Sequence, residues 1–139
     1  MPDTLAGDVG FRLARAGGAA IRNLNRALAR HGLRSRQYTV LVAAAETPGR
    51  SQRGLGELLG VDPSAVVAIV DDLERDGLVR REAHPVDRRT RLVVATDAGR
   101  ARLVEIAGSV GEVDAALLGD LDAGERATLL DLLGRLALD

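Results

Sequence analysis

Residues 55–79 read LGELLGVDPSAVVAIVDDLERDGLV and carry the most informative pattern in this 139-residue chain. Asp62 is a typical helix N-cap, and Pro63 suits the first helical position because its missing N–H would be unpaired there. Apolar residues then recur with the spacing of one helical face, at Val66, Ile69, Val70 and Leu73. Gly77 is the natural left-handed terminator. The pattern predicts a helix from Pro63 to just before Gly77.

A shorter helix is expected immediately before it. Ser51 precedes a run that holds Leu55, Leu58 and Leu59 and ends at Gly60. The three- or four-residue turn around Gly60 and Val61 would join the two helices into a helix-turn-helix, whose second helix is the candidate DNA reader.

A β-hairpin with a long charged tip is predicted after the second helix. Residues 78–82 and 91–95 have the composition of short strands, and the segment between them, AHPVDRRT, holds Asp87, Arg88 and Arg89.

Helices are also expected on both sides of this block. Residues 11–31 fit a helix with Phe11, Ile21 and Leu28 on one face, and the Gly17–Gly18 pair in its middle predicts a bend or a close helix contact. A second helix is predicted after Ser35 as its cap, with inward residues Tyr38, Leu41, Val42 and Ala45.

Two further helices are predicted at the C-terminal side. Thr96 would open a long helix that ends near Leu118, and Asp122 with Glu125 forms a capping box for a last helix. That helix carries leucine on more than one narrow stripe, so a partner subunit is expected to cover it; its leucines are Leu129, Leu130, Leu132, Leu133 and Leu136.

This order of elements resembles the MarR family of bacterial transcriptional regulators. The resemblance rests on residues 55–64, on VDDLERDGLV at 70–79, on DRR at 87–89 and on ATDAG at 95–99. It implies a mainly α fold with a small β-wing. The chain would be one domain, with a winged helix-turn-helix lobe at 34–95 and dimerisation helices at 1–33 and 96–139.

The resemblance also implies a homodimeric, sequence-specific DNA-binding regulator, by default a repressor, on a pseudo-palindromic operator. Arg89 at the wing tip would enter the minor groove, Asp87 would orient its guanidinium, and Arg88 would contact phosphate. The alternative reading of Asp87 and Arg89 is a salt bridge that closes the turn.

On the recognition helix, the expected outward residues near its start are Ser64, Ala65, Val67 and Ala68. Ser64 can donate to a phosphate or a base edge, and Val67 and Ala68 can pack on thymine methyl groups. Ala68 departs from the family pattern, which often has arginine or another polar residue there. Modest direct readout is therefore expected.

Phosphate contacts are expected around the start of the shorter helix. The candidates are Ser51, Gln52, Arg53, Arg34, Arg36 and Arg50, and for each arginine a solvated side chain is the alternative.

The net charge of −1 conceals an uneven distribution. Residues 34–91 hold ten arginines against nine acids, whereas residues 92–139 hold four against nine, and the chain has no lysine. Near-neutrality predicts weak non-specific DNA binding, with affinity that depends on a few placed arginines.

Family members commonly bind small, often aromatic, anionic molecules. Arg12, Arg15, Arg36 and Tyr38 are the candidate anchors here, with surface or dimer-interface roles as alternatives. Such a ligand would stabilise a dimer whose two DNA readers are wrongly spaced.

Other classes of protein are disfavoured. The chain has no cysteine, and its two histidines, His31 and His84, lie far apart, so no cofactor or metal site is expected. The sequence holds no phosphate loop or nucleophile motif, so an enzyme is not expected. The absence of a signal peptide or membrane span favours a cytoplasmic protein. A winged-helix module that binds protein instead of DNA remains the alternative function.

Overall fold

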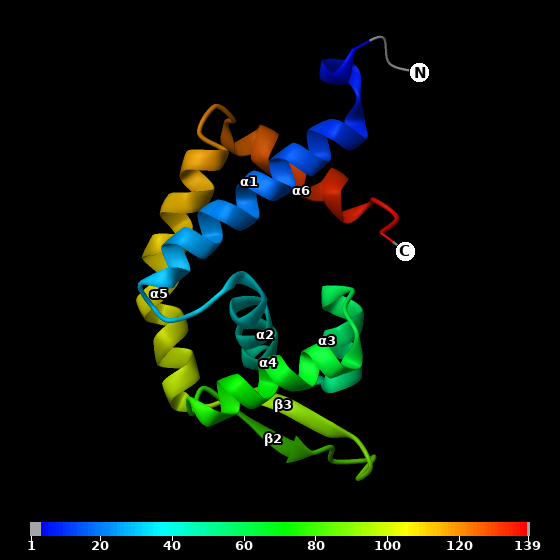
Figure 1. The fold of residues 1–139 in the computed structure, drawn as a ribbon, viewed down its shortest axis with the longest axis vertical. Helices are drawn as coiled ribbons and strands as arrows, with labels where there is room; N and C mark the ends of the chain where they lie inside the picture. The colour runs from blue at the N-terminus through cyan, green and yellow to red at the C-terminus, as the bar shows by residue number, and fades with distance from the viewer. Residues whose placement is uncertain (1–3, 139) are drawn as a thin grey trace.

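The computed structural model describes residues 4–138, and Figure 1 shows the order of its elements. They are the 3-10 turn η1 (Leu5–Gly7), α1 (Val9–Ala29), α2 (Ser35–Ala45), β1 (Arg50–Ser51), α3 (Gln52–Leu59), α4 (Pro63–Arg75), β2 (Val79–Ala83), β3 (Arg91–Ala95), α5 (Asp97–Leu117) and α6 (Ala123–Gly134). The predicted fold class, mainly α with a small β-wing, is confirmed.

The chain forms a lower lobe and an upper arm in the view of Figure 1. The lobe holds α2, α3, α4 and the sheet, the arm holds α1 and α6, and α5 runs from the lobe into the arm. The antiparallel sheet has the order β1-β3-β2, with Arg81 opposite Val93. Strand β1, which the sequence did not reveal, pairs Arg50 with Val93 and Ser51 with Leu92. It fixes the start of α3 to the wing.

Aliphatic side chains from both parts build the core. The fully buried residues include Leu28, Val40, Leu41, Leu55, Val66, Val70, Leu73, Val79, Val93 and Ile106. The predicted stripe of α4 is therefore correct at Val66, Val70 and Leu73, and Ile69 is partly buried against this core. The inward placement of Val42 is wrong, because α2 turns Val40, Leu41 and Ala44 inward and leaves Val42 exposed.

The helix caps agree with the sequence only in part. In α6 the predicted capping box is present: Asp122 Oδ1 accepts from the Glu125 N–H at 2.8 Å, and Glu125 Oε1 accepts from the Asp122 N–H at 3.1 Å. The cap assigned to Ser35 is wrong, because Ser35 is already helical and its N–H donates to Asn25 Oδ1 at 2.7 Å. Asp62 stands at the N-cap of α4, but its side chain makes no capping hydrogen bond.

Helix α1 runs without interruption through Gly17 and Gly18. A Cβ added at Gly17 would meet no described atom within 4 Å, and one added at Gly18 would meet only the Arg22 side chain of the same helix. Within residues 4–138, therefore, the predicted close contact with another helix is absent at this pair.

A tight junction joins the end of α4 to the start of α5. Gly77 adopts a φ of 74°, and its carbonyl accepts from the Thr96 hydroxyl at 2.6 Å. Thr96 also caps α5 by accepting from the Gly99 N–H at 3.0 Å, and its own N–H donates to the Leu78 carbonyl at 3.0 Å. Gly99 then packs directly against the Leu78 backbone. Helices α4 and α5 are thus connected through a few closely packed backbone groups.

Two arginines of α5 extend this junction. Arg100 donates to the Ala45 carbonyl at the end of α2 at 3.0 Å, and Arg102 donates to the His31 carbonyl after α1 at 2.9 Å. Cations are favourable at the carboxyl ends of helices, where carbonyls lack intrahelical partners.

Among the described helices, none is long and apolar enough to cross a membrane.

Candidate nucleic-acid interface

The predicted DNA-reading residues lie along the start of α4. Ser64, Val67 and Ala68 are exposed, whereas Ala65 is half-buried. Strand β2 packs against α4, so the wing and this helix belong to one packed unit. The outward placement of Ser64, Val67 and Ala68 agrees with the helical spacing that suggested it, and Ala65 lies at the margin of the exposed face.

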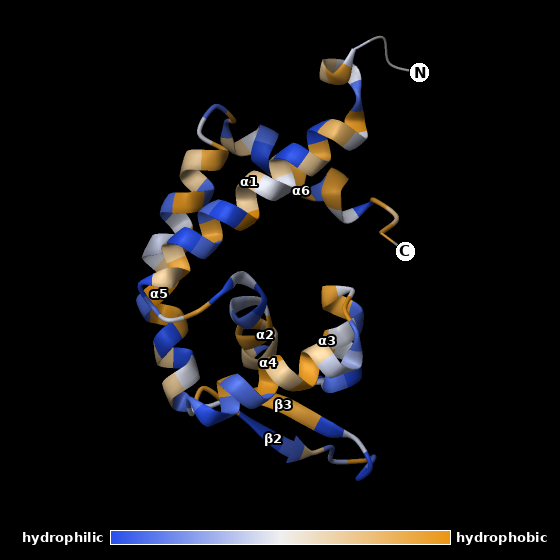
Figure 2. Cartoon of the chain, in the orientation of Figure 1, coloured by the Kyte–Doolittle hydropathy of each residue, from blue (hydrophilic) through white to orange (hydrophobic). Residues whose placement is uncertain are grey.

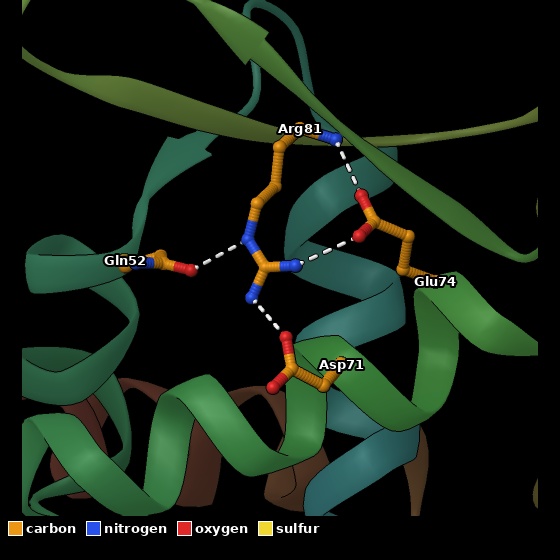
Figure 3. Close-up of polar contacts among 4 residues, drawn as sticks. All are labelled: Gln52, Asp71, Glu74 and Arg81. Atoms are coloured by element: carbon orange, nitrogen blue, oxygen red, sulfur yellow. Dashed lines mark hydrogen bonds and ion pairs between the residues drawn. The ribbon is translucent and has the colours of Figure 1, made fainter.

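Arg81 of β2 ties this unit together, as Figure 3 shows. Its Nε donates to Gln52 Oε1 at 2.8 Å, its Nη1 to Glu74 Oε1 at 2.9 Å and its Nη2 to Asp71 Oδ1 at 2.7 Å. Its backbone N–H donates to Glu74 Oε2 at 3.2 Å. The Arg81 side chain is only 20% exposed, and its contacts hold α3, α4 and the wing in one arrangement. We call Arg81 and its three partners, Gln52, Asp71 and Glu74, the Arg81 clamp.

Breaking the clamp should lower the stability of the lobe. Arg81→Met keeps the aliphatic stem but leaves Asp71 and Glu74 without their cation, so we expect the free energy of unfolding to fall by about 1–2 kcal/mol. Urea denaturation at low and high salt measures this loss, which should shrink as salt screens the two acids.

Arg80→Met is the matched control, because Arg80 is the neighbouring arginine and makes only an exposed ion pair with Glu82. It should cost less than about 0.5 kcal/mol. Equal losses in the two variants would show that the clamp contributes nothing beyond a surface ion pair.

The wing tip is ordered by its own hydrogen bonds. His84 Nδ1 accepts from the N–H groups of Val86 and Asp87 at 3.1 and 3.0 Å, and the His84 N–H donates to the Thr90 carbonyl at 3.0 Å. Arg88 and Arg89 are exposed on this tip, and no ion pair joins either of them to another residue in the part of the chain described. The tip therefore presents two cations on a fixed loop.

Asp87 acts on the backbone of the tip, which corrects the predicted contact with the Arg89 guanidinium. Its Oδ1 accepts from the Arg89 N–H at 3.1 Å, and its Oδ2 accepts from the Thr90 hydroxyl at 3.0 Å. This local closure is typical of aspartate in turns. Asp87 therefore fixes where the Arg89 side chain leaves the loop, and it leaves the guanidinium itself unbound.

The predicted phosphate contacts fall into two groups. Ser51 caps α3 by accepting from the Gly54 N–H at 3.0 Å, and Gln52 accepts from Arg81, so both side chains already have internal partners. Arg50 pairs with Glu46 at 2.8 Å and Arg53 pairs with Glu57 at 3.4 Å, both at exposed positions. Exposed ion pairs of this kind are weak enough to exchange for a phosphate.

A pocket of about 520 Å³ opens between α1, α2 and α4. Its lining includes Ile21 and Ile69 as apolar walls, Arg34 and Arg36 as cations, and Ala65 and Ala68 from the start of α4. A molecule bound in this pocket would touch the recognition helix itself.

The four predicted ligand anchors do not meet in one site of the chain. Arg36 lines the pocket just described, whereas Arg12 and Arg15 line a hollow on α1, and Tyr38 lines a smaller one between α2 and α3. Burial raises the pKa of Tyr38, and the negative charge of Asp114 raises it further, so this phenol stays protonated. Among these four residues, Arg36 alone lies beside the recognition helix.

The two histidines lie in different parts of the fold, His84 at the wing tip and His31 after α1. No group of three or more histidine and acidic residues that could hold a metal ion occurs within residues 4–138. His84 instead organises the wing tip, and the His31 carbonyl receives Arg102.

Sequence reasoning missed Arg81 and His84 as residues that shape this interface. A signal for Arg81 was present: Asp71 and Glu74 lie three residues apart on one helix face and precede a strand that carries an arginine. For His84 no signal was available, because its role depends on the path of the loop.

The upper arm carries an exposed apolar surface on α1 and α6, visible as orange segments in Figure 2. Its exposed large side chains include Val9, Phe11, Leu13, Ile21, Leu130, Leu132 and Leu133, with Leu136 just after α6. Leu130 is 75% exposed. A helix with this much exposed leucine is expected to be buried against another protein surface in solution.

Comparisons with known proteins agree with this architecture. The model of the MarR family matches residues 31–90. A Thauera aromatica protein, assigned as a transcriptional regulatory protein for the hcr operon, is 36% identical over 134 residues, which are 96% of this chain and 81% of that protein.

Two solved structures from Rhodococcus superpose closely. A MarR-family transcriptional regulator of Rhodococcus sp. RHA1 has a TM-score of 0.88 at 36% identity, with 95% of this chain and 94% of that chain covered. CouR of Rhodococcus jostii RHA1, bound to p-coumaroyl-CoA, has a TM-score of 0.88 at 34% identity, with 99% and 100% covered.

Proposed function

Because this chain belongs to the MarR family of transcriptional regulators, we propose that it binds an operator as a homodimer and represses transcription by occupying it. The observation that carries the proposal is the ordered wing tip, which presents Arg88 and Arg89 beside a recognition helix to which the Arg81 clamp fixes it. Arginine on a fixed extended tip is suited to a narrow, electronegative minor groove.

Each subunit would then make two kinds of contact. The start of α4 would enter a major groove with Ser64, Val67 and Ala68 outward, and the wing tip would enter the adjacent minor groove. Arg88, Arg50, Arg53 and Arg36 would contact phosphates, which position the protein without specifying sequence. The two subunits together read a pseudo-palindrome because a twofold dimer presents the same surface twice.

Selection from a random duplex library, followed by a gel-shift titration against salt, tests this function. A palindromic motif should be enriched, and log affinity should fall linearly with log salt, with a slope set by the phosphates neutralised. A protein that enriches no sequence, or whose partner binding ignores salt, would contradict DNA binding and favour a winged-helix module that binds protein.

The exposed apolar side chains of the arm support dimerisation. Leu130→Ala should weaken the dimer about a hundredfold, since an exposed leucine that becomes buried at an interface contributes about 1.5 kcal/mol and the dimer loses one leucine from each subunit. Sedimentation equilibrium measures this change. Val86→Ala is the control, because Val86 is also apolar and exposed but lies at the wing tip, and it should leave the dimer constant unchanged. Equal dimer constants for the parent and Leu130→Ala would place the interface elsewhere.

An anionic or phenolic effector would bind the pocket between α1, α2 and α4. The volume of about 520 Å³ lies in the range typical of small-molecule sites, and Arg34 and Arg36 supply positive charge at its wall. CouR binds an aromatic acyl-CoA, so the probes are p-coumaroyl-CoA and p-coumarate.

Calorimetry with these probes, followed by titration of the operator complex, tests the effector proposal. Arg36→Ala should reduce the affinity of the bound probe about tenfold, because a charged hydrogen bond to an anion contributes about 1.5 kcal/mol or more. Arg135→Ala, an exposed arginine of the arm, is the control. Unchanged affinity in Arg36→Ala would exclude this pocket as the site.

A further inference from the structure

We propose that the recognition helix identifies its operator by the methyl groups of thymine, with Val67 as the principal contact and without a bidentate hydrogen bond to guanine. This inference rests on the proposed function, since it specifies which bases α4 reads. It specifies the operator further: each half-site should contain thymine at the positions whose major-groove edges face the start of α4.

The exposed stripe of α4 is apolar where it would meet bases. Ser64, Val67, Ala68 and Asp71 follow the spacing that brings residues to one helix face. Val67 is 38% exposed and Ala68 is exposed, so their methyl groups form the middle of this stripe. The stripe ends at Asp71, about one turn beyond Val67 and Ala68, and the Asp71 carboxylate accepts a hydrogen bond from Arg81.

Side chains that could make a bidentate contact to guanine are missing from the start and middle of this surface. From Pro63 to Glu74 the sequence PSAVVAIVDDLE contains no arginine, lysine, asparagine or glutamine. Arg75, in the last turn, pairs with Asp72 at 3.1 Å. All three guanidinium nitrogens of Arg81 are engaged by Gln52, Glu74 and Asp71. No side chain from Pro63 to Glu74 can therefore make the bidentate contact to guanine O6 and N7, and Arg75 lies more than two helical turns beyond Val67.

The major groove offers an apolar surface only at thymine. Every base pair presents donors and acceptors there, but the C5 methyl group of thymine is the one feature that Val67 and Ala68 can contact favourably. A guanine or cytosine at the same position would lose its hydration against these methyl groups without gaining a partner. Ser64 can supply one hydrogen bond at the helix start, which leaves the methyl contact as the main source of discrimination.

Replacing thymine with deoxyuridine, one position at a time, in the selected operator tests the proposal. Deoxyuridine removes the methyl group and preserves base pairing, so we expect about fourfold weaker binding for each contacted thymine, as for one buried methylene-sized group. A converse experiment changes such a thymine–adenine pair to a cytosine–guanine pair, with or without a C5 methyl group on the cytosine. The 5-methylcytosine duplex should bind about fourfold more tightly than the unmethylated one.

Two valine variants assign the effect to the recognition helix. In Val67→Ala the deoxyuridine penalty at one position should fall below twofold, because the contacting methyl groups are gone. Val42→Ala is the matched control: Val42 is 36% exposed, on α2 and outside the proposed reading stripe, and this variant should retain the full fourfold penalty.

The outcomes separate this inference from the function on which it rests. If no sequence is enriched in the selection, DNA binding itself is refuted. If an operator is enriched but every deoxyuridine substitution leaves binding unchanged, or if Val67→Ala keeps the full penalty, thymine-methyl readout by Val67 is refuted while DNA binding stands.

Discussion

Arg89→Ala is expected to weaken operator binding by about a hundredfold or more while the fold and the dimer remain intact. Arg89 lies on the wing tip with its backbone N–H held by Asp87, and its side chain is exposed. One arginine contact in a groove contributes about 1–3 kcal/mol, and the dimer loses two of them. Gel-shift titration at fixed salt, with circular dichroism and sedimentation on the same samples, measures the effect.

Arg88→Ala is the matched control for this prediction, because it removes the same charge one position earlier on the same tip. As a phosphate contact, Arg88 should lower affinity for all sequences alike and reduce the salt slope by about one for each subunit. Arg89→Ala should in addition abolish the preference for operators with an A-tract beneath the wing. If the two variants lose the same affinity on operators with and without the A-tract, Arg89 does not read groove width.

Gly99→Ala should destabilise the protein by about 3 kcal/mol, near the upper end for overpacking in a core. A Cβ at this position would overlap the carbonyl oxygen of Leu78 and would lie 3.1 Å from Leu41 Cδ1. The obstacle is backbone, so relief requires α5 to move away from the end of the recognition helix. Urea denaturation at constant protein concentration measures the loss.

Gly108→Ala in the same helix provides the control. A Cβ at Gly108 would meet no atom within 4 Å in the described chain, and alanine is the better helix former by about 1 kcal/mol. This variant should therefore be neutral or slightly more stable than the parent. If Gly99→Ala unfolds at the same urea concentration as Gly108→Ala, the junction between α4 and α5 is not close-packed.

The elements of the fold could be predicted because each has a local signal. Asp62 with Pro63 marks the start of α4, Gly77 marks its end, and the Asp122–Glu125 box marks α6. Strand β1 could not be predicted, since two residues carry no periodicity and pair only because β3 lies beside them. The burial of α2 was misjudged at Val42 because the orientation of a short apolar helix is set by what surrounds it.

The candidate site was predictable at the level of position and less so at the level of contacts. The placements of Ser64, Val67, Ala68, Arg88 and Arg89 follow from helix spacing and from the length of the hairpin, and the structure shows all five exposed. The partners of Asp87, Ser51 and Gln52 differ from the expected ones, because short polar side chains bond first to nearby backbone or to a neighbouring element. Such choices depend on tertiary geometry.

The Arg81 clamp has a consequence for the base-pair spacing that the dimer tolerates. Because Gln52, Asp71, Glu74 and Arg81 join the wing to α3 and α4, the step between the proposed major-groove and minor-groove contacts of one subunit would be fixed. The distance between the two subunits has no such constraint within the lobe. An added base pair inside a half-site should therefore abolish recognition. A base pair added at the centre of the palindrome should be tolerated better, because a movement of the arms can change the distance between the two lobes.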